Sequence, residues 1–540
     1  MNEAHVVSGK RTRKPVQRYA PEGRSRALKT IVRLSKLQPP KKFSEIEHRD
    51  DGADWLSAYK KEIQSLEDVG GFEVIRRKEV PEGAQVLKIL ELFTEKHDGR
   101  KKCRIVVRGD LERGSKSKEN YSPTADGTSI RLVAGLAASK GWPLRQLDVS
   151  TAYLYGRTSE PIFVELPEGH PKRDGRNMVY KTFSSVYGLK RAPKIWNGTL
   201  HKFLLSLGFK NCPVERCLYR KRDFYLLVYV DDLLYTARSM KEIREFEEKI
   251  GSKFKVRIEK EVTKFVGYEF EVTEGSVKLK QEAYIKKLVE TFGLEDGKSY
   301  ETPMQSNLDL EKNNGKPLED RQLYQGLLGA LLFVNLGTRP EISFAVNQLS
   351  RMAKNPTITH LKLLKRVARY LKGSAGLGLE FKRAKEVELS LYVDSSWANS
   401  AGRKSIFGFT VLLNGTPVVF RSKQQSIVAL STTEAEYVGL CGAVRELLYV
   451  RNLLRFLGVR MKHPLRVMND NQAALKIGEN LSSVSRTKHI ELKYFFVQDL
   501  VEEEKIKLEY VPTEDMVADI FTKALDKIKF RAFRDQMLTE

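Results

Sequence analysis

Cysteine is scarce in this chain of 540 residues, which contains four: Cys103, Cys212, Cys217 and Cys441. Four cysteines so far apart in the sequence exclude a disulfide framework and a four-cysteine zinc site. We therefore expect all four to be reduced thiols, most of them buried.

Long apolar runs are also missing. The longest, residues 326–334, is far shorter than the roughly 20 residues that a transmembrane helix needs. The polar N-terminus has no apolar core of the kind found in secretory signals. The sequence therefore predicts an intracellular protein with no membrane partner.

Acidic residues are outnumbered, with 69 Asp and Glu against 94 Lys and Arg, a net charge of +25. The cations are spread over most of the chain, which indicates a polyanionic partner and favours nucleic acid over a membrane surface. A hydrophobic content of 41% is enough for several globular cores.

Residues 1–45 form a basic segment with little apolar periodicity. We interpret it as a flexible tail, either a solvated linker, which is slightly favoured, or an arm for nuclear import or nucleic-acid binding.

An apolar run over residues 224–235 is interrupted by two neighbouring acids, Asp231 and Asp232. The pattern predicts two buried strands joined by a tight turn. Neighbouring carboxylates against a core repel each other and lose hydration, so a divalent cation would stabilise them. An ordinary polar turn is the alternative, because Asp is a common turn residue.

A further acid, Asp148, lies near the end of a predicted strand over residues 144–149. Residues 150–153 follow it directly, so the carboxylate is a candidate either for a metal site or for the N-cap of a helix.

The sequence pattern of residues 386–540 predicts the order strand, strand, strand, helix, strand, helix, helix, strand, helix. Four acids lie at element ends: Asp394 at the end of the first strand, Glu434 at the start of the first long helix, Asp470 at the end of a strand, and Asp519 at a late helix. Each has a local alternative, since Ser431 and Glu434 form a capping box and Asp470 is a candidate cap. Four acids that converge at one sheet edge would hold two divalent ions for phosphodiester hydrolysis.

Longer sequence motifs surround these acids, and they resemble the reverse transcriptase and ribonuclease H part of copia-type (Pseudoviridae) LTR retrotransposon Pol polyproteins. The resemblance covers nearly the whole chain from about residue 45. The matching words are RQLDVSTAYLYG (145–156), VYGLKRAPKIW (186–196), YVDD (229–232), TRPEI (338–342), DSSW (394–397), ALSTTEAEY (429–437), DNQAA (470–474), RTKHI (486–490) and ADIFTK (518–523). The sequence has no aspartic protease motif and no zinc-binding module, so we expect a polymerase segment of a longer polyprotein.

The resemblance implies an α+β multidomain fold, a right-hand polymerase with fingers, palm and thumb, a connection and a C-terminal RNase H-like α/β domain. The expected segments are a basic flexible tail over 1–45, fingers and palm over 46–236, thumb over 237–295, connection over 296–385 and the RNase H-like domain over 386–540.

The implied function is RNA- and DNA-templated DNA synthesis together with hydrolysis of RNA in RNA–DNA hybrids, which copies retrotransposon RNA into cDNA. The alternative is a catalytically silent nucleic-acid-binding or assembly protein derived from such an element. A group II intron or telomerase type of polymerase lacks the fused C-terminal segment.

Seven carboxylates match the family's catalytic and metal-binding acids: Asp148, Asp231, Asp232, Asp394, Glu434, Asp470 and Asp519. The resemblance implies two ions, Mg²⁺ or Mn²⁺, at each of two active sites. Six residues match the nucleotide-binding positions: Lys102, Arg104, Tyr153, Tyr187, Gly188 and Lys190. Tyr153 also fits an ordinary core tyrosine, and His489 is interpreted as structural.

The implied partners are an RNA template, a DNA primer, the RNA–DNA hybrid and deoxynucleoside triphosphates. A tRNA primer and an integrase or a second copy of the chain are further candidates. The expected location is the cytoplasm, in a virus-like particle, with the nucleus as the alternative.

Overall fold

The computed structural model describes residues 38–95, 99–113, 120–173, 177–306, 308, 310, 315–479 and 491–540. The predictions for His489 and for the tail up to residue 37 lie outside these residues. The chain forms two compact units, which we call the first unit (the described residues of Met1–Asn120 and Tyr153–Ile195) and the second unit (Tyr121–Ala152 and Trp196–Glu540). This division does not test the five expected segments, whose boundaries stay predictions.

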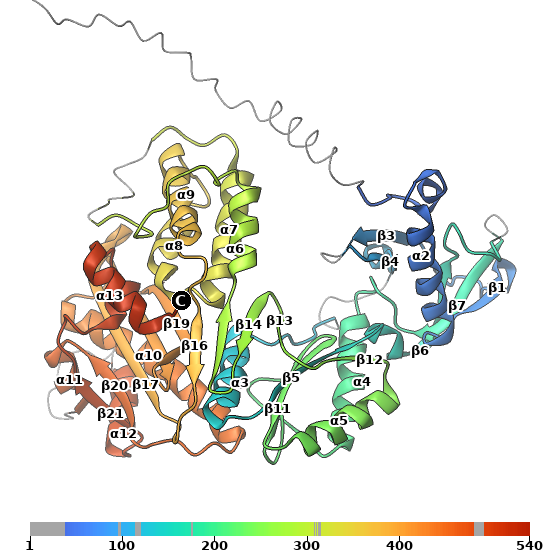
Figure 1. Ribbon diagram of the computed structural model, residues 1–540. Helices are drawn as coiled ribbons and strands as arrows, with labels where there is room; N and C mark the ends of the chain where they lie inside the picture. The colour runs from blue at the N-terminus through green and yellow to red at the C-terminus, as the bar shows by residue number, and fades with distance from the viewer. Residues whose placement is uncertain are drawn as a thin grey trace, which may run out of the picture. The chain divides into compact units, whose positions relative to one another are not determined.

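The first unit is built around helix α2 (Gly52–Asp68), whose Trp55, Tyr59 and Ile63 recur at spacings of four and are buried. This helix packs against a two-stranded hairpin, β3 (Ile89–Glu95) and β4 (Lys101–Val107). A four-stranded sheet with the order β1-β7-β6-β2 completes the unit (Figure 1). Its strands are β1 (Glu73–Arg76), β2 (Val86–Leu87), β6 (Arg157–Glu165) and β7 (Met178–Ser184).

The second unit begins with a six-stranded sheet of order β12-β5-β11-β10-β9-β8. Its strands are β5 (Leu144–Val149), β8 (Lys210–Asn211), β9 (Leu218–Lys221), β10 (Phe224–Tyr229), β11 (Asp232–Ala237) and β12 (Val256–Glu259). Helices α3 (Gly127–Lys140) and α5 (Met240–Lys253) pack against this sheet, and α4 (Ala192–Ser206) leads into it from the first unit. The predicted strand over 144–149 and the predicted hairpin are confirmed.

A second sheet, of order β13-β14-β15-β16, joins segments about a hundred residues apart. Its strands are β13 (Lys264–Phe265), β14 (Tyr268–Val272), β15 (Ser276–Lys280) and β16 (Leu379–Lys382). The helices α6 (Glu282–Thr291), α7 (Arg321–Gly337), α8 (Ser343–Ser350) and α9 (Ile358–Lys372) belong to the same part of the chain. Because β15 pairs with β16, the segments expected to be thumb and connection share one sheet.

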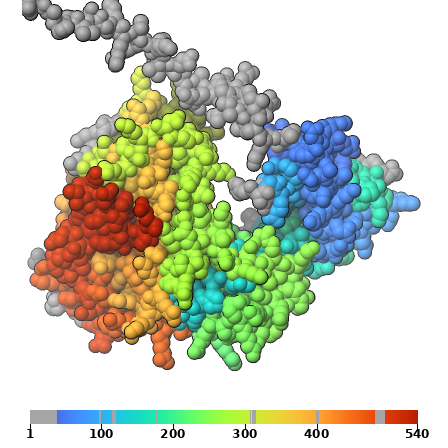
Figure 2. All heavy atoms as spheres, in the orientation of Figure 1, coloured from blue at the N-terminus to red at the C-terminus, as the bar shows by residue number. Residues whose placement is uncertain are grey.

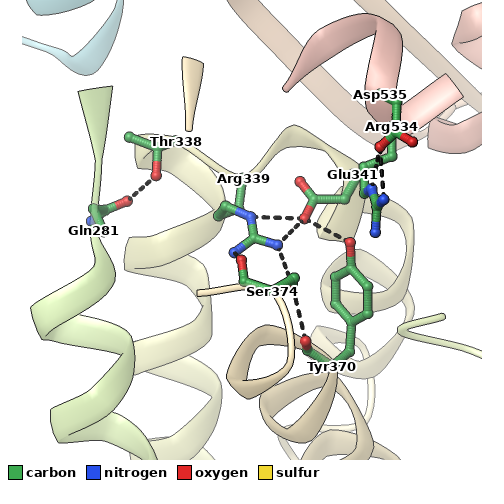
Figure 3. Close-up of polar contacts among 8 residues, drawn as sticks. All are labelled: Gln281, Thr338, Arg339, Glu341, Tyr370, Ser374, Arg534 and Asp535. Carbon is green, nitrogen blue, oxygen red and sulfur yellow. Dashed lines mark hydrogen bonds and ion pairs between the residues drawn. The ribbon is translucent and has the colours of Figure 1, made fainter. Parts of the chain in front are cut away.

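A buried ion pair ties this helical part together (Figure 3). The Arg339 guanidinium donates to Glu341 Oε1 at 2.8 Å, and both side chains are fully buried. The same guanidinium donates to the backbone oxygen and hydroxyl of Ser374, each at 2.7 Å, while the Tyr370 hydroxyl donates to Glu341 Oε1 at 3.1 Å. The arrangement connects the loop after α7 with α9 and the turn that follows it.

The C-terminal part has a five-stranded sheet of order β19-β18-β17-β20-β21, in which β17, β18 and β19 are antiparallel and β20 and β21 run parallel to β17 (Figure 1). Its strands are β17 (Leu389–Ser400), β18 (Lys404–Leu413), β19 (Thr416–Gln424), β20 (Leu465–Asn469) and β21 (Ile506–Tyr510). Its helices are α10 (Thr432–Phe456), α11 (Gln472–Glu479), α12 (Glu491–Glu502), the short 3-10 helix η9 (Val517–Phe521) and α13 (Lys527–Met537). The predicted order of strands and helices is confirmed, as is the α+β multidomain class. The last helix, α13, drawn in red in Figure 2, packs onto α9 through Phe530, whose ring centroid lies 5.5 Å from that of Tyr370.

Helices lie on both faces of this sheet. Gly408 of β18 has no room for a Cβ because Phe521 of η9 lies against it. Its neighbour Phe407 lies against Gly439 of α10 instead. Since neighbouring residues of a strand point to opposite faces, α10 and η9 cover opposite faces of the sheet.

All four cysteines are buried and none forms a disulfide, as expected. In the part of the chain that the structure describes, no helix is both long enough and apolar enough to cross a membrane.

Candidate active sites

The hairpin of β10 and β11 turns over two residues. Tyr229 pairs with Asp232, so the turn consists of Val230 and Asp231, and Asp232 is the first residue of β11. Val230 has φ 59°, a conformation that two-residue hairpin turns need and that β-branched residues rarely adopt. The Trp196 indole N–H donates to Val230 O at 2.7 Å and holds the turn in place.

The neighbouring strand brings a third carboxylate to this turn. Asp148 of β5 lies directly opposite Asp232 of β11, and the backbone N–H of Val149 donates to Asp231 O at 2.8 Å. Asp148 is thus a strand residue inside the sheet. The structure brings together the three carboxylates that the sequence singled out here.

The electrostatics of this cluster favour a positive partner. Burial, followed by the charges of Asp231 and Asp148, raises the pKa of Asp232 to about 6. A hydrogen bond with the Gln146 side chain and the charge of Arg257 act in the opposite direction. Carboxylate oxygens are the hard donors that Mg²⁺ and Mn²⁺ prefer, so a divalent ion would offset the repulsion among these three side chains.

A second carboxylate cluster lies in the C-terminal part. One oxygen from each of Asp394, Glu436 and Asp470 lies within 4.8 Å of the other two. Asp394 lies in the middle of β17, not at its end as the sequence predicted, and Asp470 directly follows β20. The parallel strands β17 and β20 are neighbours, which places these two acids side by side. This donor set also fits a divalent ion.

Glu434 is not the glutamate that joins this cluster, so the prediction is corrected to Glu436. The backbone N–H of Glu434 donates to Ser431 Oγ at 3.1 Å, and Glu434 Oε2 accepts from the Leu430 N–H at 2.7 Å. Its carboxylate is used in capping α10, the local alternative that the sequence also offered. Glu436, by contrast, is 3% exposed.

Polar neighbours hold the second cluster. The Thr522 hydroxyl donates to Asp394 Oδ2, and the Thr513 hydroxyl donates to Asp470 Oδ2 at 2.8 Å. The Asn469 amide donates to Glu436 Oε2 at 3.1 Å and to the backbone oxygen of Val393 at 2.8 Å. The Asp470 carboxylate is therefore hydrogen-bonded to Thr513. Helix α11 is capped by the side chain of the next residue, Asn471, which accepts from the Ala474 N–H.

Burial and mutual repulsion shift these acids. Burial and the charge of Asp519 raise the pKa of Asp394 to about 7. Burial and the charge of Asp394 raise the pKa of Glu436 well above its usual range. Carboxylates that resist ionisation together are those that a bound cation would stabilise most.

Asp519 is fully buried in η9 and is paired with two lysines. Lys523 Nζ lies 2.7 Å from Asp519 Oδ1, and Lys529 Nζ lies 2.8 Å from Asp519 Oδ2. Its charge reaches Asp394, but its oxygens are not among those of the close group formed by Asp394, Glu436 and Asp470. Its expected role in metal binding therefore stays a prediction.

The six predicted nucleotide-binding residues all lie in the first unit, whereas both carboxylate clusters lie in the second. The rings of Tyr153 and Tyr187 meet edge to face with centroids 5.0 Å apart, and the Arg104 guanidinium lies 5.8 Å from the Tyr187 centroid. Gly188 has φ 95°, and a Cβ there would lie 2.0 Å from Val107 O. Lys190 is exposed. Their nucleotide-binding role stays a prediction.

Strand β4 has one face in the core and one more exposed face. Cys103 and Ile105 are buried, while Arg104 is exposed and Lys102 is half-buried. Glu62 also lies near these cations: its carboxylate accepts from the Ile105 N–H at 3.2 Å. Burial raises the pKa of Glu62, and the charges of Lys102 and Arg104 lower it.

Sequence reasoning missed Glu436, although a signal for it was present. Glu436 precedes the buried Leu440, Val444 and Leu447 at helical spacing, so it begins the core-facing stripe of α10. An acid on such a stripe is costly unless it has a function. The contacts of Thr522, Lys523 and Lys529 had no comparable signal, because they depend on how η9 and α13 pack.

The chain is similar in sequence to known reverse transcriptases and retrotransposon proteins. The family model described as reverse transcriptase (RNA-dependent DNA polymerase) matches residues 72–306. The chain is 34% identical over 457 residues to the retrovirus-related Pol polyprotein from transposon RE1 of Arabidopsis thaliana, covering 83% of this chain and 31% of that polyprotein. It is 31% identical over 308 residues to a putative transposon Ty5-1 protein of Saccharomyces cerevisiae, covering 56% of this chain and all of that protein.

Among solved structures, the foamy viral protease-reverse transcriptase in complex with RNA/DNA hybrid is similar with a TM-score of 0.43 at 14% identity, covering 82% of this chain and 51% of that one. The chain spans about a third of the length of the Arabidopsis polyprotein.

Proposed function

The chain belongs to the reverse transcriptase family of copia-type retrotransposon Pol polyproteins, and we propose that it copies retrotransposon RNA into cDNA. In this proposal it synthesises DNA on RNA and DNA templates and also degrades the RNA strand of RNA–DNA hybrids. The observation that carries the polymerase part is the opposition of Asp148 and Asp232, with Asp231 in the adjoining turn.

Asp148, Asp231 and Asp232 would hold the divalent ions of the polymerase, Mg²⁺ or Mn²⁺. When bound, such ions lower the pKa of a primer hydroxyl and neutralise the charge of the transferred phosphoryl group. The protein's own contribution is to fix the carboxylates. The backbone hydrogen bond from Val149 to Asp231 and the indole of Trp196 hold the turn rigid, so that no reorganisation is needed during reaction.

The nuclease part rests on the group formed by Asp394, Glu436 and Asp470. These three carboxylates, with Asp519 as a further candidate ligand, would hold the ions for hydrolysis of an RNA phosphodiester. Asn469, Thr513 and Thr522 orient one carboxylate each through hydrogen bonds. Such outer contacts keep ligating oxygens in position.

Nucleotide contacts are assigned in this proposal to the first unit. Arg104, Lys102 and Lys190 would meet the phosphates of the incoming nucleotide, and Tyr153 would lie against its sugar. The net charge of +25 supports a sequence-independent grip on phosphate backbones. The partners are then an RNA template, a primer such as a tRNA or DNA strand, their hybrid and deoxynucleoside triphosphates, with integrase or a second copy as further partners. The proposed location is a cytoplasmic virus-like particle, with the nucleus as the alternative.

The polymerase assignment is tested by primer extension on an RNA template with Mg²⁺ or Mn²⁺. Wild type should extend the primer, and Asp231→Asn should lose extension by about a hundredfold or more. Asp223→Asn provides a matched control, because Asp223 precedes the other end of β10, and it should extend as wild type does. Wild-type protein that binds the hybrid but neither extends nor cleaves would instead favour a silent nucleic-acid-binding protein.

A further inference from the structure

A basic pocket of about 1070 Å³ lies in the second unit, apart from both carboxylate clusters. Its walls come from three segments: the end of α3 with the residues that follow it (139–142), the loop before β17 (383–387) and the loop after α10 (458–462). Val387 precedes β17, and Asp394 lies five residues beyond the start of that strand. At about 3.3 Å per residue, the strand alone separates them by roughly 16 Å.

Five cations line the pocket: Lys140, Arg383, Lys385, Arg460 and Lys462. Among the described residues of the lining, the only acid is Glu386. Within the described part of the chain, none of the five cations forms an ion pair with a carboxylate. Lys385, Arg460 and Lys462 are exposed, so their charged ends are available to a ligand.

The ends of two helices offset part of this positive charge, but not all of it. The C-terminal ends of α3 and α10 both meet the pocket, and each carries the equivalent of about half a negative charge. These ends, Glu386 and Asp223, whose charge acts on Lys140, leave roughly two of the five positive charges without compensation. Like charges gathered this closely repel each other, which an anionic ligand would relieve.

The walls are held firmly by backbone contacts. The Ala384 N–H donates to Ser139 O at 3.1 Å, and the Lys462 N–H donates to Val387 O at 3.1 Å. The Arg383 guanidinium lies against Gly141, where a Cβ would be 3.3 Å from its central carbon. The cations therefore lie on segments that backbone hydrogen bonds hold together, and they do not belong to one mobile loop.

An aromatic ring completes the pocket. Trp142 is half-buried, and Lys140 Nζ lies 4.8 Å from its ring centroid. Positive grooves with aromatic side chains are typical of single-stranded nucleic-acid sites, where cations follow the phosphates and rings stack on bases. A pocket, unlike an open flat face, admits a single strand more readily than a duplex.

We propose that this pocket binds a single strand of nucleic acid, through its phosphates on Arg383, Arg460 and Lys462 and a base beside Trp142. The site does not rest on the polymerase or nuclease assignment, because it shares no residue with either cluster. It would give the protein a hold on single-stranded RNA or DNA in addition to the duplex that the proposed active sites would grip.

The test uses the full chain with a saturating hairpin duplex already bound, so that duplex-binding surfaces are occupied. A labelled 12-nucleotide RNA, and a DNA of the same sequence, are then titrated at several salt concentrations. The pocket variant combines Arg383→Gln, Arg460→Gln and Lys462→Gln. A matched control, Arg244→Gln with Lys249→Gln and Lys253→Gln, removes the same charge from exposed positions on α5.

The proposal expects the pocket variant to bind the single strand at least tenfold more weakly than wild type, while the control stays within about threefold. The slope of log affinity against log salt should fall by about two, since each contact to a single strand contributes about 0.7. A preference for RNA over DNA would show that the site contacts the 2′-hydroxyl, and equal binding would show that it does not.

Wild-type affinity in the pocket variant, or an equal loss in the control, would overturn the proposal. The single variants Arg460→Gln and Lys462→Gln control for misfolding of the triple variant, because each residue is exposed. Each single variant should weaken binding about threefold.

Crosslinking with a 4-thiouridine RNA provides an independent readout. Crosslinks should fall on the peptides around Trp142 and Arg460, and crosslinks confined to other segments would contradict the assignment.

Discussion

Asp148 and Asp232 lie directly opposite each other on the neighbouring antiparallel strands β5 and β11. Side chains at such positions have Cβ atoms roughly 5 Å apart, and like charges there destabilise a sheet. The chain nevertheless places Asp231 in the adjoining turn as well. Three carboxylates arranged in this way weaken the fold by themselves, and a bound divalent cation would offset their repulsion.

The pH dependence of stability should reveal this repulsion. The pKa of Asp232 is raised from 3.8 to about 6, so its contribution to stability is present below pH 4 and is lost as the pH rises through 6. Without metal, Asp232→Asn should therefore be more stable than wild type at pH 8 by about 1 kcal/mol, because the half-buried side chain is partly screened by solvent. At pH 4 the two proteins should unfold alike.

Thermal unfolding in EDTA at pH 4 and pH 8 measures this difference, and Asp223→Asn is the control. A stabilisation by Asp232→Asn that is the same at both pH values would show that charge repulsion is not its cause.

Substitutions of Glu434 and Glu436, two residues apart in α10, should have different effects on RNA cleavage. Glu436→Gln removes a carboxylate from the group with Asp394 and Asp470, so RNA cleavage should fall by about a hundredfold or more. Glu434→Gln changes only the capping of α10, at a cost of about 0.5 to 1 kcal/mol in stability, and cleavage should stay within about twofold. Cleavage of a labelled RNA strand in a hybrid measures both variants.

The reverse result, with Glu434→Gln inactive and Glu436→Gln active, would restore the prediction made from the sequence. Loss in both variants to the same degree would point to a damaged helix start, which a melting curve of each variant identifies.

The sequence predicted the order of strands and helices from β17 to α13 because apolar periodicity is a local property. It also predicted the hairpin around Asp231. It could not predict that Asp232 faces Asp148, because strand register is set by tertiary pairing. The choice between Glu434 and Glu436 failed for a related reason: both lie in the first turns of α10, and only packing decides which one faces Asp394.

The buried pair of Arg339 and Glu341 should be a large contributor to stability (Figure 3). Arg339→Ala leaves Glu341 buried without its positive partner, so the free energy of unfolding should fall by about 3 to 5 kcal/mol. The double variant Arg339→Met with Glu341→Leu should recover a large part of this loss, since no charge is then buried.

Urea unfolding measures these changes, and Lys382→Ala provides the control. Lys382 pairs with Glu380 at 3.4 Å with 70% of its side chain exposed, so its loss should cost less than about 1 kcal/mol. A loss below about 1 kcal/mol for Arg339→Ala would contradict the role given to the buried pair.

Gly188 should be intolerant of any side chain. Its φ of 95° opposes substitution, and so does the distance of only 2.0 Å that would separate an added Cβ from Val107 O. Gly188→Ala should destabilise the first unit by about 2 kcal/mol and expose it to limited proteolysis. Gly83→Ala is a suitable control for conformation alone, because Gly83 also has a positive φ but no atom within 4 Å of its Cβ position. Equal protease sensitivity of the two variants would show that the contact with Val107 is unimportant.

We propose that the chain contains two separate metal-dependent active sites. This proposal is tested most directly by one assay that follows a labelled primer and a labelled RNA template together, with wild type, Asp231→Asn and Asp470→Asn. The account predicts that Asp231→Asn loses extension and keeps RNA cleavage, while Asp470→Asn loses cleavage and keeps extension. Loss of both activities in either variant, or of neither in both, would contradict it.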